Sequence, residues 1–209
     1  MLKRLLYLFT QEARDMMDRA VAVLLMMIFY TFYFAKIVIQ KRQAIKTNQM
    51  GAGNKPRKVL LTERAVCCAT VLAAVFGAGS IFFSKQLPAW EIRMTGMAAG
   101  IAGTIFFGMA TVTMKTSWRV GIPEEKTTLV TEGIYRWSRN PAFVGFDLLY
   151  LSMCLMFFNL PLACVSVWAA VMLHVQILQE ETHMGKMFGN EYESYKKRTL
   201  RYFGKRKGI

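Results

Sequence analysis

The sequence predicts an all-α, polytopic integral membrane protein with about five transmembrane helices, and three observations support this prediction. Hydrophobic residues make up 54% of the 209 residues, far more than a soluble domain of this size usually carries. Apolar runs of about twenty residues, the length that crosses a bilayer core, recur along the chain. The 27 Lys and Arg residues outnumber the 13 Asp and Glu residues and cluster between these runs, which indicates membrane flanks rather than a surface for nucleic acid.

The first three predicted spans are residues 20–40, 65–84 and 94–114. The first is interrupted only by Lys36, whose stem can lie in lipid while its ammonium group reaches the headgroups. The other two carry no charge and are rich in small residues, which let helices approach closely in lipid. These spans form the N-terminal part, residues 1–114, of a single membrane domain that covers residues 1–209.

The last two spans are predicted at residues 141–158 and 161–179. Residues 148–179 carry no formal charge and are too long for one span, and Asn159-Leu160-Pro161 predicts a turn between two helices. We therefore expect a tight hairpin, followed by short cytoplasmic helices at the C-terminus. Residues 115–209 would hold this hairpin together with the cytoplasmic segments on either side of it.

Two further signals mark helix ends on the cytoplasmic side. Asn140 suits a helix N-cap and Pro141 the first helical position, because proline lacks the N–H that would have no partner there. Gly189 suits a C-cap, after which Glu193 and Lys197 fall at i,i+4 on a second short helix. Residues 48–56 are polar and predict a mobile loop.

Orientation follows from the distribution of Lys and Arg between the loops. With five spans, the loops on one side carry 20 of these residues and the loops on the other side carry 6. The positive-inside rule then places the N-terminus outside and the C-terminus in the cytoplasm. We expect the protein to reside in a bacterial inner membrane or in the endoplasmic reticulum.

The sequence offers no sign of a disulfide framework or a metal site. The four cysteines (Cys67, Cys68, Cys154 and Cys164) all lie inside apolar runs, where thiols act as small hydrophobes. His174 stands alone near the middle of the fifth predicted span, so it is interpreted as an interhelical hydrogen bonder rather than a metal ligand.

Chemistry is predicted where two segments approach the same face of the membrane. Residues 129–145 read LVTEGIYRWSRNPAFVG, and a helix start with unpaired amides beside Arg139 attracts carboxylates and phosphates. Glu180 and Glu181 follow the fifth span, where adjacent carboxylates are costly unless they are solvated or paired. Because the hairpin brings the two segments to one side, we expect them to meet. A helix cap with a solvated glutamate pair remains the alternative.

These segments together resemble the isoprenylcysteine carboxyl methyltransferase and phospholipid methyltransferase superfamily. The resemblance covers residues 115–203. It is carried by eleven positions: Arg139, Asn140, Pro141, Phe143, Gly145, Glu180, Glu181, Phe188, Gly189, Glu191 and Tyr192. Two departures matter. Asn140 stands where the eukaryotic enzymes carry His, and Phe143 stands where many members carry Tyr, so a hydrogen bond from that phenol is lost.

The resemblance implies that S-adenosylmethionine binds in a cytoplasmic pocket between the last two spans, closed by the C-terminal segment. The donor's carboxylate would be received by Arg139, Asn140 and the helix start, and its ammonium and ribose hydroxyls by Glu180 or Glu181. The expected cofactor-binding residues are Tyr135, Arg139, Asn140, Pro141, Phe143, Gly145, Glu180, Glu181 and Tyr192. The expected catalytic residues are Glu181 and Arg201. Glu181, or else a water molecule, would accept the proton of an amine nucleophile, and Arg201 would hold an anionic acceptor head group or else remain a solvated arginine.

The sequence therefore supports one main functional hypothesis and two alternatives. The main hypothesis is methyl transfer from S-adenosylmethionine to a lipid-like acceptor, either a prenylcysteine carboxylate or a phospholipid amine. The alternatives are a membrane sterol reductase that uses NADPH and a membrane scaffold without activity.

Two further positions are left open. Asp147 either lines the pocket or forms a structural hydrogen bond. Trp118 and Arg119 are either interfacial anchors or substrate contacts.

Overall fold

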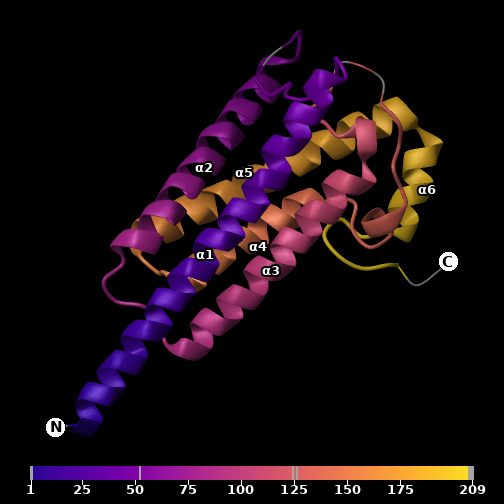
Figure 1. Ribbon diagram of the computed structural model, residues 1–209. Coiled ribbons are helices and arrows are strands. Elements are labelled where there is room, and N and C mark those ends of the chain that lie inside the picture. The colour runs from indigo at the N-terminus through magenta and orange to yellow at the C-terminus, as the bar shows by residue number, and fades with distance from the viewer. Residues whose placement is uncertain (1, 52, 124, 126, 207–209) are drawn as a thin grey trace.

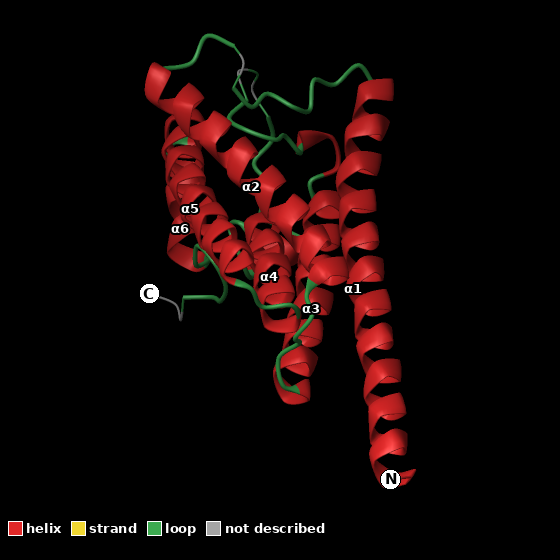
Figure 2. Ribbon diagram, turned by 90° about the vertical axis from the view of Figure 1, so that its left-hand side faces the viewer, coloured by secondary structure: helices red, strands yellow, loops and turns green. Residues whose placement is uncertain are grey.

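The protein is a bundle of helices, and the computed structural model describes residues 2–51, 53–123, 125 and 127–206. Within this part of the chain the prediction of an all-α fold is confirmed (Figures 1 and 2). The helices are α1 (Leu2–Arg42), α2 (Arg57–Phe83), α3 (Trp90–Thr113), α4 (Pro141–Met156), α5 (Leu160–Phe188) and α6 (Asn190–Arg198), with short 3₁₀ turns at Lys115–Ser117 (η1) and Gly133–Arg136 (η2).

Four helices are long and apolar enough to cross a membrane: α1, α2, α3 and α5. The fifth apolar helix, α4, has 16 residues, which corresponds to about 24 Å and is shorter than a bilayer core of about 30 Å. The fold is that of an integral membrane protein, and the count of five spans stays a prediction. The helix α5 passes the predicted end at residue 179 and continues to Phe188, because nothing interrupts it before Gly189 with its φ of 52°.

The predicted turn between the last two apolar helices is present. Asn159 is the N-cap of α5, and its side chain accepts a hydrogen bond from the amide of Leu162 at 2.9 Å. The connection is short, but the two helices separate after it. Most contacts of α4 are with α3, and most contacts of α5 are with α2.

Glycines explain why α4 packs so closely on α3. A Cβ atom added at Gly100 would lie 2.6 Å from Ser152 Oγ, and one added at Gly103 would lie 2.8 Å from the carbonyl oxygen of Gly145. Gly145 of α4 is equally close to α3, because a Cβ added there would lie 2.8 Å from Phe107 Cβ. Backbones this close leave no room for side chains, as in other small-residue helix contacts in lipid.

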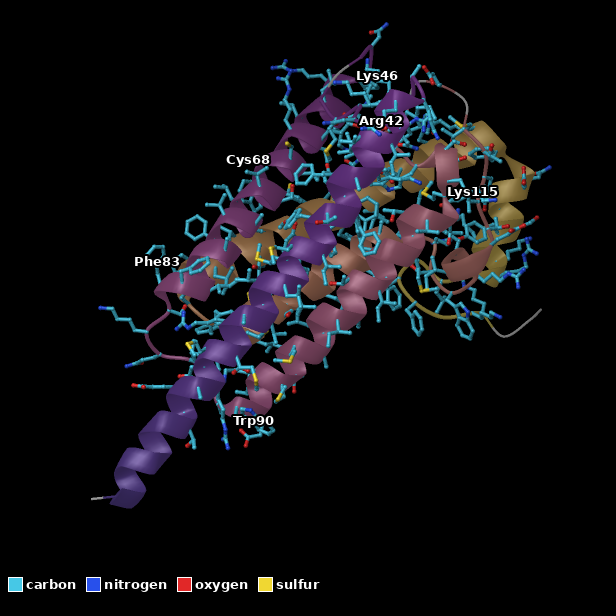
Figure 3. The ribbon with its side chains drawn as sticks, in the orientation of Figure 1. Arg42, Lys46, Cys68, Phe83, Trp90 and Lys115 are labelled. Carbon is cyan, nitrogen blue, oxygen red and sulfur yellow. The ribbon has the colours of Figure 1, made fainter. Side chains whose placement is uncertain are left out.

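The charges are distributed unequally along the bundle. The N-terminus and α6 lie at opposite ends (Figure 1). Arg42, Lys46 and Lys115 gather near the end that carries α6, whereas Phe83 and Trp90 lie toward the other (Figure 3). The predicted orientation, with the C-terminus in the cytoplasm, would place the end with α6 on the cytoplasmic side.

A buried ion pair fastens the loops at this end to α2. Glu63 is fully buried, and Lys55 Nζ lies 2.8 Å from its Oε1. The same carboxylate accepts hydrogen bonds from the amides of Gly51 at 2.8 Å and Ile122 at 2.9 Å. The predicted mobile loop at residues 48–56 is thus tied both to α2 and to the segment before η2.

Candidate active site

A cavity that encloses about 120 Å³ lies between the end of α3, the start of α4 and the C-terminal part of α5, beside α6. Seven of the predicted cofactor-binding residues line it: Tyr135, Arg139, Asn140, Phe143, Glu180, Glu181 and Tyr192. The structure therefore brings together the two segments that the sequence analysis singled out.

The start of α4 positions one side of this cavity. Pro141 is the first residue of the helix and Asn140 its N-cap, as expected. The Asn140 side chain makes no capping hydrogen bond. Its amide instead donates to Glu181 Oε1 at 3.3 Å and to the Arg201 carbonyl at 3.2 Å. Asn140 thereby links the helix start to α5 and to the C-terminal segment.

The centre of the site is a carboxylate held by two guanidinium groups. Arg139 Nη2 lies 2.8 Å from Glu181 Oε1. Arg201 donates from Nη2 to Glu181 Oε2 at 2.8 Å and from Nε to Oε1 at 3.1 Å. Such bidentate pairing is strong and fixes orientation. The hydrogen bond to Glu181 also raises the pKa of Arg201.

The C-terminal segment, residues 199–206, reaches Glu181 because it is fastened to the loop before α4. The Arg139 amide donates to the Leu200 carbonyl at 3.1 Å, and the Gly204 amide donates to the Trp137 carbonyl at 2.6 Å. The rings of Trp137 and Phe203 stack with centroids 6.1 Å apart. This segment therefore covers the charged centre from outside.

Glu180 has a different environment from its neighbour Glu181. Its Oε1 accepts a hydrogen bond from Gln176 Nε2 at 3.0 Å. Among the described residues it forms no salt bridge. It lines both the main cavity and a second cavity beside it. Of the two adjacent carboxylates, Glu180 is the one left available to a ligand.

The second cavity is mainly apolar and encloses about 90 Å³. It lies among all five long helices and shares Trp118, Arg119, Gly121, Ala142, Phe143 and Glu180 with the main cavity. A groove between α1 and α2 adjoins it and shares Tyr33, Thr70 and Phe146 with it. The groove, the apolar cavity and the main cavity are therefore neighbours between the outer surface of the bundle and the charged centre.

Tyrosines of η2 and α6 form one wall of the main cavity. Tyr195 is buried, and its hydroxyl donates to the Tyr135 carbonyl at 2.6 Å. Burial raises the pKa of both Tyr192 and Tyr195, so both hydroxyls stay protonated. Tyr135 and Tyr192 line the cavity as expected, and Tyr195 joins them.

Three of the predicted site residues do not line the cavity, and each has a structural reason. Pro141 is buried in the first turn of α4. Gly145 faces α3, where it serves helix packing rather than a ligand. Arg201 contacts the site through the Glu181 carboxylate, with its guanidinium group, and through the Asn140 side-chain amide, with its carbonyl oxygen. The expectation that these three residues contact a bound molecule stays a prediction.

Two polar groups in the membrane helices lie outside both cavities. Asp147 of α4 is not among the residues that line them, and its Oδ1 is buried without a hydrogen-bond partner among the described residues. The His174 ring stacks on Tyr202 and its Nδ1 contacts the tyrosine hydroxyl. His174 therefore bonds to the C-terminal segment rather than to another membrane helix.

Sequence reasoning missed several residues of the site. Trp118 and Arg119 line both cavities, although their position before the motif favoured an interfacial anchor. His183 lines the main cavity, and its Nε2 is buried without a partner in the described part of the chain. Gln176 positions Glu180 from one helical turn away, and this i,i+4 spacing was a signal that the sequence contained.

Fold and site together define a class of protein: a helical membrane protein with a charged cavity beside an apolar one. Comparison with known proteins gives the family. The model of the phospholipid methyltransferase family matches residues 72–191, which is more than half of the chain. The chain belongs to this family, and the predicted membership of the methyltransferase superfamily is confirmed.

Individual relatives agree with this assignment. A probable protein-S-isoprenylcysteine O-methyltransferase of Oryza sativa subsp. indica is 28% identical over 149 residues, covering 66% of this chain and 78% of the relative. The protein-S-isoprenylcysteine O-methyltransferase of Homo sapiens is 29% identical over 126 residues, covering 57% of this chain and 43% of the relative. The chain thus corresponds to most of the rice protein and to less than half of the human one.

A solved structure shares the fold. The eukaryotic intramembrane Ras methyltransferase, an isoprenylcysteine carboxyl methyltransferase, superposes with a TM-score of 0.50 at 18% identity. The match covers 73% of this chain and 54% of that chain, so this protein spans about half of the solved one. At this identity the likeness concerns the fold alone.

Proposed function

We propose that the protein transfers a methyl group from S-adenosylmethionine to an amphiphilic acceptor that enters from the membrane. The observation that carries the proposal is the position of a charged cavity beside an apolar cavity with which it shares lining residues, the apolar cavity in turn adjoining a groove on the helix surface. Membership of the phospholipid methyltransferase family supports it.

The main cavity offers groups that complement the donor. Arg139 Nε is buried without a partner among the described residues, and together with Asn140 at the start of α4 it suits a carboxylate. Glu180 suits an ammonium group or ribose hydroxyls. The tyrosine wall suits the adenine ring. When bound, S-adenosylmethionine would supply a methyl group on a sulfonium sulfur, which leaves as a neutral thioether with the bonding electron pair.

The arrangement assigns different roles to the two glutamates. Glu181 is balanced by Arg139 and Arg201, which makes it a poor proton acceptor, so we propose that it positions both guanidinium groups. Arg201 then acts through Glu181. An amine acceptor must lose a proton as its nitrogen bonds the methyl carbon, and Glu180 is the carboxylate that faces both cavities. A carboxylate acceptor needs no base.

Most of the rate enhancement would come from orienting the nucleophile toward the methyl group and from excluding water. Methyl transfer is an in-line displacement, for which holding the nucleophile about 3 to 3.5 Å from the methyl carbon in a water-excluded site is effective. The C-terminal segment and α6 cover the charged centre on one side. The apolar cavity excludes water on the other.

The acceptor is proposed to enter sideways through the groove between α1 and α2. A lipid or prenyl tail partitions into the bilayer with a gain of about 0.8 kcal/mol per methylene, without tail-specific contacts. Transfer should therefore rise steeply with tail length among acceptors that share one head group.

The test uses phosphatidylethanolamines and prenylcysteines of graded tail length, with labelled methyl donor, in detergent and in liposomes. We expect the short, water-soluble analogues to be poor acceptors even at high concentration. Equal turnover of a short soluble analogue and a long-tailed acceptor at equal bulk concentration would exclude entry from the membrane.

A further inference from the structure

The passage between the two cavities carries two charged side chains that are not paired with each other. Among the residues that line either cavity, the Arg139–Glu181 pair is already matched. Arg119 and Glu180 remain, and both line the main cavity and the apolar cavity. We call this pair of positions the junction.

Arg119 is held in place by hydrogen bonds that leave its charge unmatched. Its Nη1 donates to the carbonyls of Thr116 at 2.6 Å and Trp118 at 3.0 Å. Its Nε is buried and has no partner within the described part of the chain. It forms no salt bridge to any described residue. A guanidinium fixed in this way is prepared to receive an anion.

The position of Arg119 indicates which ligand it serves. A donor molecule that fills the main cavity already has Arg139 and Asn140 for its carboxylate. A tail that fills the apolar cavity carries its head group to the junction, because that is where the two cavities share their lining. The head group must also meet the transferred methyl there, so the residue beside it is Arg119 and not Arg139 or Arg201.

We propose that Arg119 binds the anionic group of the acceptor head, and that the acceptor is an amphiphile with a phosphate or carboxylate close to the atom that is methylated. This inference rests on the proposed function and adds the chemistry of the head group. Guanidinium groups bind phosphate and carboxylate through the same forked hydrogen bonds, so both sources share this chemistry.

Glu180 acts on the other end of the acceptor head group, the atom that is methylated. Its carboxylate attracts a cationic or N–H-bearing nucleophile. An acceptor oriented by Arg119 therefore presents its anionic group toward the segment before η2 and its nucleophilic atom toward Glu180 and the donor. Arg119 is a specificity-determining residue in this arrangement.

The test compares Arg119→Gln, Arg119→Lys and the control Arg136→Gln, which removes an exposed arginine outside both cavities. Three long-tailed acceptors are used in liposomes: phosphatidylethanolamine, a prenylcysteine, and a primary alkylamine without an anionic group. Affinity for S-adenosylmethionine is measured separately on each purified variant.

We expect Arg119→Gln to raise KM by about 10- to 100-fold for anionic acceptors, the effect of losing a hydrogen bond to a charged group. Arg119→Lys should raise KM less, and Arg136→Gln should leave it unchanged. The alkylamine should show no change in KM, and donor affinity should match the wild type. A loss confined to one anionic acceptor would identify phosphate or carboxylate as the group bound.

Three results would overturn the inference: an unchanged KM for anionic acceptors, an equal loss for all three acceptors, or weaker donor binding in Arg119→Gln. Failure of the proposed function has a different signature. Wild-type protein that binds no S-adenosylmethionine, or that binds it and methylates none of the three acceptors, contradicts the function itself.

Discussion

Glu180 and Glu181 are neighbours in sequence but have opposite electrostatic surroundings. Glu181 receives hydrogen bonds from two guanidinium groups and an amide, whereas Glu180 receives one from Gln176. The helical rotation of about 100° between consecutive residues separates them. One carboxylate therefore organises the site and the other faces the ligands.

Removing either charge should weaken donor binding for different reasons. Glu181→Gln leaves Arg139 and Arg201 without their shared partner, and Glu180→Gln removes the proposed contact to the donor's ammonium or ribose. We expect each change to cost roughly 1.5 to 3 kcal/mol of binding free energy, the value of a hydrogen bond to a charged group. Calorimetric titration of S-adenosylmethionine into each variant measures this. Unchanged affinity in both variants would remove the pair from the donor site.

The sequence predicted local features of the site more completely than its long-range pairings. The Asn140-Pro141 helix start and the Gly189 break depend on the conformational preferences of single residues, and both were found. Gly145 belonged to the recognised motif, yet its role depends on Phe107 and Gly103 in α3. For Arg119 the sequence left an interfacial anchor and a substrate contact both open, because the cavities that it lines are formed by helices distant in sequence.

Among the elements, the contact between α3 and α4 sets the position of the cavity wall. A methyl group at Gly103 would meet the Gly145 carbonyl, so Gly103→Ala forces the helices apart. We expect a loss of about 1 to 3 kcal/mol in stability, the usual cost of overpacking. The matched control is Gly79→Ala in α2, where a Cβ meets nothing within 4 Å, so this change should not destabilise the protein. Thermal unfolding in detergent micelles compares the two, and equal effects would contradict the packing argument.

The Lys55–Glu63 pair should contribute far more to stability than an exposed pair of the same chemistry. Replacing Glu63 by Gln leaves the Lys55 ammonium buried without a counter-charge, at a cost of about 3 to 5 kcal/mol. Glu193→Gln breaks the exposed Lys196–Glu193 pair and should change stability by less than about 1 kcal/mol. The same unfolding assay measures both. Similar shifts in the two variants would show that Glu63 does not anchor the loops.

The buried Lys55–Glu63 pair also shows why the contacts of residues 48–56 could not be predicted from sequence. Polar residues 48–56 predict mobility by composition alone. Gly51 and Lys55 instead contact the Glu63 carboxylate of α2, which also accepts a hydrogen bond from the amide of Ile122, 59 residues away in sequence. Composition describes what a segment prefers in isolation, and it contains no information about a partner on a distant helix.

For the whole molecule, the sequence predicted the class of fold because the bilayer constrains it so strongly. Spanning segments must be helical and apolar, so long apolar runs in the sequence predict helices, while the number of five spans stays a prediction. The separation of α4 from α5 could not be predicted in this way, because it depends on which helices carry the glycines that permit close approach.

Orientation is the first prediction for the whole molecule. The unequal count of Lys and Arg places the C-terminus in the cytoplasm and the N-terminus outside. A reporter fused after Ile209 should behave as cytoplasmic, and one fused before Met1 should not. Finding both termini on one side would exclude five spans in this orientation.

The most direct measurement of the central claim is a side-by-side titration of the purified protein with S-adenosylmethionine and with NADPH. The charged cavity between Arg139, Glu180 and the tyrosine wall predicts saturable binding of S-adenosylmethionine that weakens in Glu181→Gln, with no saturable binding of NADPH. Saturable binding of NADPH alone would contradict the account in favour of a reductase, and binding of neither ligand would leave the fold without the proposed activity.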